Sequence, residues 1–279
     1  KNQKLYGLNA SGRSPKNLTL DYFLENNYSK IPAYGPLPVS VPGCVDGWFE
    51  LHERFGSLEM QKLLAPAISY AENGFPVTEL VAYYMQLTSK RFRSYPNFTE
   101  TYCINGNAPQ KGDVFKNPDL ANTLKTIALK GRKGFYEGPV AKTIAQFIKE
   151  QGGFLTYNDL KTHTSEWITP VTASYRGYDV WELPPNGQGI AALQILNLLE
   201  GYDIKSMGFG SASYIHHFVE AKKIAFADRA KFYSDMAFNT IPVSKLISKD
   251  YANSRRNEIQ PQRAMRQDTA ENLEDGDTT

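Results

Sequence analysis

The sequence has 279 residues, of which 41% are hydrophobic and 13% aromatic, enough to form one large domain or two small ones around a packed core. The formal net charge is only +2, and no stripe of lysine and arginine runs along the chain, so we expect no nucleic-acid partner. No apolar run approaches the ~18 residues needed to cross a bilayer. Neither the two cysteines, Cys44 and Cys103, nor the four histidines have metal-ligand spacing, and we expect no metal site and no required disulfide.

The first 47 residues are rich in proline, glycine, serine and asparagine. The stretch "IPAYGPLPVSVPGCVDGW" at 31–48 contains four prolines and three glycines, which predicts an ordered loop without a helix. Helical sequence follows. Ser57 is a candidate N-cap and Gly74 a candidate stop, and Pro66 between them predicts either two helices or a kinked one.

The middle of the chain predicts two more helices and a hairpin. Asn117–Pro118 and Gly131 bound one helix, and Pro139 and Gly152 bound the next, following the rule of proline just inside a helix start and glycine just past its end. Residues 171–183 then alternate between apolar and polar around Arg176–Gly177, which predicts two strands joined by a tight turn.

The last third predicts an apolar helix over 189–200, ended by Gly201, and a long helix that begins near Ser211. We expect the long helix to face inward through its apolar residues Ile215, Phe218, Val219 and Ile224. His216 and His217 have no acidic or thiol partner at ligand spacing, which favours structural or surface roles.

Three carboxylates follow in the same region. An acid/base set is one interpretation of Glu220, Asp228 and Asp235, but pairing with Lys222, Lys223 and Arg229 is favoured. From about residue 253 the apolar period is lost, and we expect a long exposed segment.

The chain ends in "ENLEDGDTT", which raises the question of chemistry at Thr278. A threonine hydroxyl becomes a useful nucleophile when a base lies beside it, and the amine of the same residue is such a base once it is a chain terminus. Attack of the Thr278 hydroxyl on the Asp277 carbonyl, followed by hydrolysis of the resulting ester, would create that amine. Asp-Thr-Thr is a common sequence, so this motif alone does not separate a nucleophile from a solvated tail.

The rest of the chain supplies the context, because its motifs occur in the order and spacing of a known family. The segment 41–77, "VPGCVDGWFELHERFGSLEMQKLLAPAISYAENGFPV", is followed by "GFYEGPVAKTIAQFIKEQGGFLTYNDL", and then by "PVTASYRGYDVWELPP", "LQILNLLEGYD" and "EAKKIAFADRAKFYSD". Together these segments resemble the γ-glutamyltranspeptidase (glutathione hydrolase) family over nearly the whole chain.

The resemblance implies an α/β (α+β) N-terminal-nucleophile hydrolase with an αββα sandwich, of which this chain holds mainly the helix-rich large-subunit part. Family members are precursors that cut themselves into a large and a small subunit before a threonine. By that pattern the self-cleavage bond joins Asp277 and Thr278, and Thr278 is the nucleophile. Residues 1–277 are then a partial large subunit whose N-terminal segment is missing, and 278–279 begin the small catalytic subunit, which would be the partner. The fragment alone would be inactive.

One motif departs from the family pattern. Members that act on γ-glutamyl compounds usually carry an arginine in R-E-x-A-P, whose guanidinium binds the substrate α-carboxylate. Here the stretch is "LNASGRSP", which places Ser11 at the arginine's position and Arg13 two residues later. Two roles stay open for Arg13: a substrate contact, or a structural or surface role.

The sequence therefore predicts a self-processing threonine hydrolase/transferase that cleaves γ-glutamyl amides such as glutathione and passes the acyl group to water or an amino acid, without metal or cofactor. One alternative is a related acylase of the cephalosporin-acylase or poly-γ-glutamate-processing kind. Another is a non-catalytic homologue that acts as a binding module. Family resemblance suggests a periplasmic or extracellular location, and a cytoplasmic one stays open.

Overall fold

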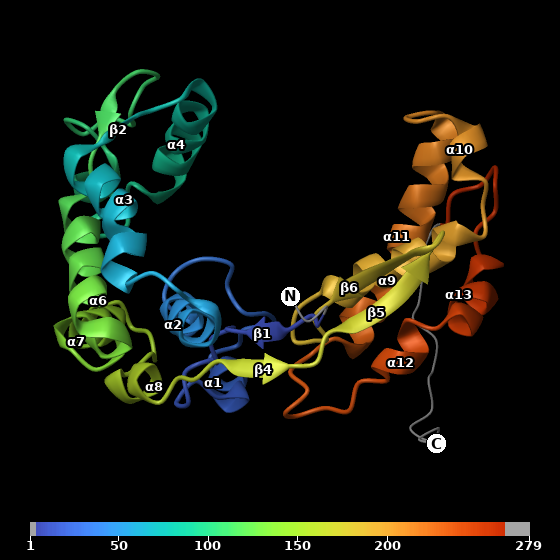
Figure 1. Cartoon of the computed structure of the whole chain (residues 1–279), viewed down its shortest axis with the longest axis horizontal. Coiled ribbons are helices and arrows are strands. Elements are labelled where there is room, and N and C mark those ends of the chain that lie inside the picture. Colours follow the sequence, from blue (N-terminus) through green and yellow to red (C-terminus); the bar gives the residue numbers. More distant parts are fainter. Residues whose placement is uncertain (1–3, 266–279) are drawn as a thin grey trace. The chain divides into compact units, whose positions relative to one another are not determined.

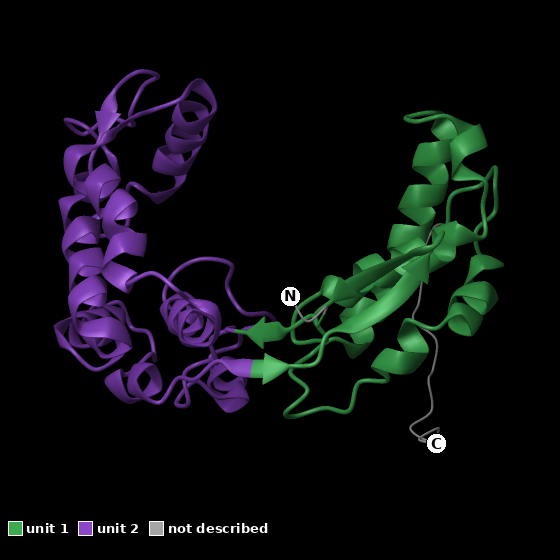
Figure 2. Cartoon of the chain, in the orientation of Figure 1, with its two compact units in different colours: residues 1–9, 167–279 green, residues 10–166 purple. Residues whose placement is uncertain are grey.

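The computed structural model describes residues 4–265, which divide into two compact units (Figures 1 and 2). One unit comprises residues 10–166, and the other comprises residues 4–9 together with 167–265. The predicted cleavage pair Asp277–Thr278 lies outside the described residues. Among the helices of the described part, none combines the length and the apolar character that crossing a membrane requires.

The unit of residues 10–166 is mostly helical. Its elements are α1 (Leu20–Glu25), α2 (Cys44–Phe55), α3 (Met60–Asn73), β2 (Phe75–Pro76), α4 (Glu79–Phe92), α5 (Phe98–Tyr102), β3 (Val114–Phe115), α6 (Pro118–Tyr136), α7 (Pro139–Glu150) and α8 (Tyr157–Lys161). β2 and β3 pair antiparallel, with Phe75 opposite Phe115. The main core lies between α2, α6, α7 and α8, where Val45, Ile127, Ile148 and Leu160 are buried. Each such side chain contributes about 1.5–3 kcal/mol on leaving water.

The starts of α6 and α7 confirm the sequence prediction, whereas α6 continues past Gly131, its predicted end. Asn117 caps α6, its side chain accepting a hydrogen bond from the Leu120 amide at 2.9 Å, with Pro118 in the first turn. Gly131 interrupts the helix with φ of 64°, a value that suits glycine, and a second helical piece runs on to Tyr136. α7 begins at Pro139 as predicted.

Two predictions in the first 75 residues were wrong. α2 begins at Cys44, inside the stretch predicted to lack a helix, because the last helix-breaking pair is Pro42–Gly43 and the chain is free to coil after it. Ser57 does not cap α3: the helix begins at Met60, and its N-cap, Glu59, makes no side-chain cap bond. Gly74 ends α3 as predicted, with φ of 91°, and Pro66 lies within a single helix.

The second unit combines small sheets and helices. Its elements are β1 (Gly7–Asn9), which pairs with β4 (Glu166–Ile168), the hairpin of β5 (Val171–Tyr175) and β6 (Tyr178–Glu182), and the helices α9 (Gly189–Glu200), α10 (Ile204–Met207), α11 (Ala212–Phe232), α12 (Val243–Leu246) and α13 (Lys249–Arg256). The hairpin is confirmed: Tyr175 lies opposite Tyr178, and Arg176 and Gly177 both have positive φ, as a type I′ turn requires.

The inward face of α11 differs from the prediction except at Ile224, which is buried as expected. The helix begins after Ser211 as expected, but Ile215, Phe218 and Val219 are 51%, 43% and 40% exposed. The buried face instead carries His217, Glu220, Ala221, Ile224, Ala225 and Asp228. Apolar periodicity could not show this face, because half of it is polar and its partners lie on other segments.

The three carboxylates have separate partners. Glu220 pairs with Lys223 at 2.6 Å, as favoured by the sequence. Asp228 pairs with Arg255 at 3.2 Å rather than with the neighbouring Arg229, since Arg255 is buried against it. Asp235 accepts a hydrogen bond from the Ala237 amide.

The segment from residue 253 is also less exposed than predicted. α13 extends to Arg256, Arg255 is 1% exposed, and Ile259 is 5% exposed. Arg255 is held by a buried ion pair with Asp228, and Ile259 packs in an apolar cluster. Neither contact produces a periodic pattern in the sequence.

Candidate functional site

The loop that carries Arg13 packs backbone to backbone against the Val41–Pro42–Gly43 segment. The Val41 amide donates a hydrogen bond to the Arg13 carbonyl at 3.0 Å. A Cβ on Gly12 would lie 1.6 Å from the Val41 carbonyl oxygen, and one on Gly43 would lie 1.9 Å from the Ala10 carbonyl oxygen. Only glycine allows these approaches, so the two sequence stretches form one rigid loop pair.

The Arg13 side chain is held at the surface by a carboxylate. Its Nη2 lies 3.1 Å from Oε1 of Glu166, and the two side chains are 55% and 57% exposed. An ion pair this exposed contributes little to stability. The pair therefore orients the guanidinium rather than stabilising the fold.

Asp46, in the first turn of α2, lies at the centre of a buried polar network in the same unit. It is 1% exposed. Its Oδ2 accepts hydrogen bonds from the amide and the hydroxyl of Ser165, each at 2.6 Å, and its Oδ1 accepts one from Nε of Arg132. Arg132 also donates to the His163 carbonyl, so the carboxylate and the guanidinium together fix residues 163–165.

The charge states in this network follow from its contacts. Burial raises the pKa of Asp46, but hydrogen bonds from Ser165 and Arg132 outweigh it and hold the pKa below its usual range. Burial raises the pKa of Tyr136 to about 12. Tyr136 thus stays protonated, donates to the Pro42 carbonyl at 2.5 Å and accepts from the Asp46 amide at 3.1 Å.

The Asp46 network supports the two parts of the chain that contact Arg13: Glu166 and the 41–43 segment. It fixes Ser165, which precedes the Glu166 that orients the guanidinium, and it fixes Pro42, which lies in the segment against which the Arg13 loop packs. Sequence reasoning missed this network. Asp46 lies within a quoted family motif, but its partners are 86 and 119 positions away and no local pattern indicates them.

His163 is the one imidazole in residues 4–265 that has a buried nitrogen without a hydrogen-bond partner, its Nε2. This nitrogen lies 3.9 Å from Oδ2 of Asp46, beyond hydrogen-bond distance. Burial lowers the pKa of His163, although the Asp46 charge acts in the opposite direction. The ring is therefore neutral at neutral pH.

The buried, neutral His163 should make the free energy of unfolding depend on pH. Below pH about 6.5 the unfolded chain binds a proton at His163 that the folded chain does not, so the free energy of unfolding should fall as pH drops from 7 to 5. Denaturant unfolding of the full-length protein at several pH values measures it, and His163→Gln should flatten the slope in this window. An unchanged slope in the variant would contradict the assignment.

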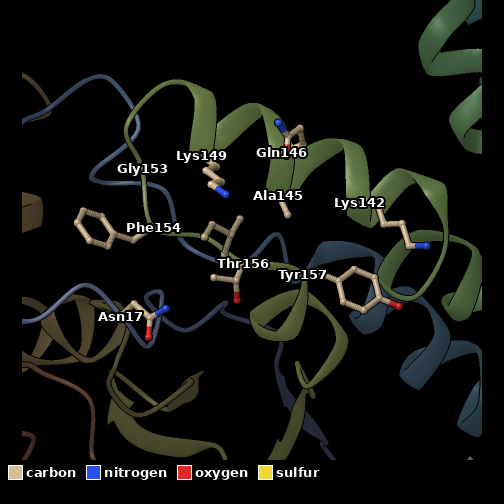
Figure 3. Close-up of a pocket in the computed structure, with 10 residues that line it drawn as sticks. Asn17, Lys142, Ala145, Gln146, Lys149, Gly153, Phe154, Thr156 and Tyr157 are labelled. Atoms are coloured by element: carbon tan, nitrogen blue, oxygen red, sulfur yellow. The ribbon is translucent and has the colours of Figure 1, made fainter.

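A separate cavity of about 450 Å³ opens in the same unit between α7 and the segment 153–157 (Figure 3). α7 contributes Lys142, Ala145, Gln146 and Lys149, and Asn17 approaches from the other side. No carboxylate, histidine or cysteine lines it, and Arg13 is not among its residues. The titratable groups that line it are the amines of Lys142 and Lys149 and the phenol of Tyr157.

The other site predictions have different outcomes. Thr278 and Asp277 lie outside the described residues, so their roles stay predictions. Within residues 4–265, no three histidine, cysteine or acidic side chains gather as a metal site. His217 contacts the Ser213 carbonyl and His216 the Gln260 carbonyl, each at 2.8 Å.

The chain belongs to the gamma-glutamyltranspeptidase family, whose model matches residues 1–279. It is 40% identical over 252 residues to the glutathione hydrolase-like YwrD proenzyme of Bacillus subtilis, covering 90% of this chain and 48% of that protein. The chain thus spans about half the length of this relative.

Comparison with solved structures supports the same family. The Helicobacter pylori gamma-glutamyltranspeptidase superposes with a TM-score of 0.89 at 32% identity, covering 99% of this chain and 81% of that one. A cephalosporin acylase from Bacillus halodurans superposes with a TM-score of 0.87 at 38% identity, covering 93% of this chain and 49% of that one. The predicted fold class, the helix-rich part of an N-terminal-nucleophile hydrolase, is confirmed.

Proposed function

We propose that this chain is most of the large-subunit portion of a self-processing threonine hydrolase/transferase that acts on γ-glutamyl amides such as glutathione. The observation that carries the proposal is that the family match runs through residues 277–279, so the Asp277–Thr278 pair falls within it. A relative that is 40% identical is a glutathione hydrolase-like proenzyme, which supports a precursor that is cut into two subunits.

The proposed processing needs only the chain and water. The Thr278 hydroxyl attacks the Asp277 carbonyl, and the acyl chain moves from the Thr278 nitrogen to its oxygen. Water then hydrolyses the ester, leaving a carboxylate on Asp277 and a free amine on Thr278. In turnover the same hydroxyl attacks the substrate amide, the Thr278 amine carries the proton to the leaving amine, and water or an amino acid takes the acyl group from the enzyme.

Arg13 is the proposed contact for the substrate α-carboxylate, in place of an arginine at Ser11. Its side chain is more than half exposed, and its Nη2 lies 3.1 Å from a carboxylate oxygen of Glu166, which supports a guanidinium placed to bind carboxylate oxygens. The Gly12 and Gly43 contacts and the Asp46 network hold the loop beneath it.

Replacing Arg13 by methionine should weaken binding of a γ-glutamyl donor. Loss of one charge-assisted hydrogen bond, about 1.5–3 kcal/mol, raises KM by about tenfold to a hundredfold with little change in kcat. Steady-state kinetics on a γ-glutamyl anilide measure this effect. The exposed Arg93, replaced in the same way, is the matched control and should leave KM unchanged. An unchanged KM in Arg13→Met would assign Arg13 a surface role.

The rival within the fold is an acylase, favoured by the likeness to the cephalosporin acylase and by serine at position 11. A panel of amides on the full-length protein separates the two, with the γ-glutamyl anilide beside its glutaryl analogue, which keeps the carboxylate and lacks only the α-amino group. The γ-glutamyl proposal predicts preference for the first compound. Preference for the glutaryl compound would establish the acylase, and no turnover of either, with no self-cleavage, would leave a binding module.

A further inference from the structure

The last described residues of the chain are held on α11 by a contact that no apolar pattern indicates. Oε2 of Glu220 accepts a hydrogen bond from the Met265 amide at 2.7 Å, and Nζ of Lys223 donates to the Met265 carbonyl at 2.9 Å. Oε1 of Glu220 accepts from the same Lys223 at 2.6 Å, which closes the arrangement. We call these three residues the Met265 clamp.

The clamp is built on a buried carboxylate. Glu220 is 1% exposed, and both its oxygens have partners, one of them a backbone amide 45 positions along the chain. Burying a carboxylate is costly unless it is paired, and an apolar residue would fill the same core position more simply. The Met265 side chain adds a third attachment, since it packs on the cluster of Leu198, Ile224 and Ile259.

Further contacts define the path of the chain just before the clamp. Nε2 of His216 donates to the Gln260 carbonyl at 2.8 Å, and the Arg263 amide reaches the same carbonyl at 3.3 Å. Ile259 is buried in the same cluster. α11 therefore fixes the position of the chain up to residue 265.

We propose that the Met265 clamp is a positioning device for self-processing: it fixes the start of the segment 266–277 that carries the scissile Asp277–Thr278 bond. The inference rests on the proposed function. Those twelve residues can span at most about 40 Å, so an anchor at Met265 limits where the bond can go. Without the clamp, the last buried attachment before the scissile bond is Ile259. The unattached segment, which we call the tether, would then lengthen from twelve residues to the eighteen residues 260–277.

The lengthened tether sets the size of the effect. Effective concentration falls as about the −3/2 power of tether length, so this change slows delivery of the bond about twofold. After cleavage Thr278 belongs to a separate chain. The clamp should then no longer matter to turnover.

The test is the rate of self-cleavage of the full-length precursor with Glu220→Gln, followed on gels after pulsed cell-free synthesis. Glu200→Gln is the matched control, because Glu200 likewise accepts from a lysine, Lys249, and from a backbone amide, that of Arg176, at a place remote in sequence from the processing segment. We expect cleavage at least about twofold slower in Glu220→Gln, parental cleavage in Glu200→Gln, and unchanged turnover per cleaved molecule in both.

Lys223→Met, with the adjacent exposed Lys222→Met as its control, gives a second test if the buried variant fails to fold. Parental cleavage rates in folded clamp variants would overturn the inference and leave the proposed function intact. Equal slowing in the Glu200 and Glu220 variants would also overturn it, by assigning the effect to general destabilisation. A parent that never cuts would overturn the proposed function, and the inference with it.

Discussion

Replacing Thr278 by alanine should leave the full-length precursor uncut and abolish turnover of a γ-glutamyl anilide. The alanine has no hydroxyl to attack either the Asp277 carbonyl or the substrate amide, so both reactions lose their nucleophile. We expect the rate of turnover to fall by at least about a thousandfold, as removal of a catalytic nucleophile generally does. Initial rates at saturating donor measure it.

Thr278→Ser is the matched control for this variant. Serine keeps the hydroxyl and the future α-amine, so it should still cut and still turn over, more slowly than the parent. A Thr278→Ala protein that cuts and turns over like the parent would remove Thr278 from the mechanism.

Of the substitutions considered in the unit of residues 10–166, Asp46→Ala should lower the free energy of unfolding most. It leaves the guanidinium of Arg132, whose side chain is 26% exposed, and the Ser165 amide without their shared acceptor. Breaking a buried ion pair by removing one partner costs about 3–5 kcal/mol, and because Arg132 is partly exposed we expect a loss of about 3 kcal/mol here. Denaturant unfolding of the full-length protein measures the loss.

Two control variants distinguish the effect of losing the hydrogen-bond network from the effect of losing a negative charge. Asp46→Asn keeps one oxygen acceptor and should lose less stability, whereas Asp21→Ala, at an exposed carboxylate in the first turn of α1, should lose about 0.5 kcal/mol or less. A loss below about 1 kcal/mol in Asp46→Ala would show that the network does not hold the loop. An Asp46→Ala protein that is as stable as the parent but has a raised KM for the γ-glutamyl donor would show that the network positions Arg13 without contributing to stability.

Local signals in the sequence were enough for much of the fold. The structure confirms the predicted helix start at Asn117–Pro118, the helix end at Gly74 and the turn at Arg176–Gly177. Each of these depends on the backbone chemistry of one or two residues. Such signals are local because a cap or a turn is completed within four residues.

The missed features depend on contacts between distant segments. The Asp46 network joins α2 to residues 86 and 119 positions away, and the buried face of α11 is polar because Asp228 pairs with Arg255, 27 positions later. The predicted inward positions Phe218 and Val219 followed apolar character alone, which cannot indicate a buried carboxylate whose partner lies on another helix.

Self-cleavage before Thr278 underlies the whole proposed function, and the intact mass of the full-length protein measures it. We expect two fragments from the parent, the smaller beginning at Thr278, and one uncut chain from Thr278→Ala. A parent that is folded and yet remains a single chain would rule out self-processing.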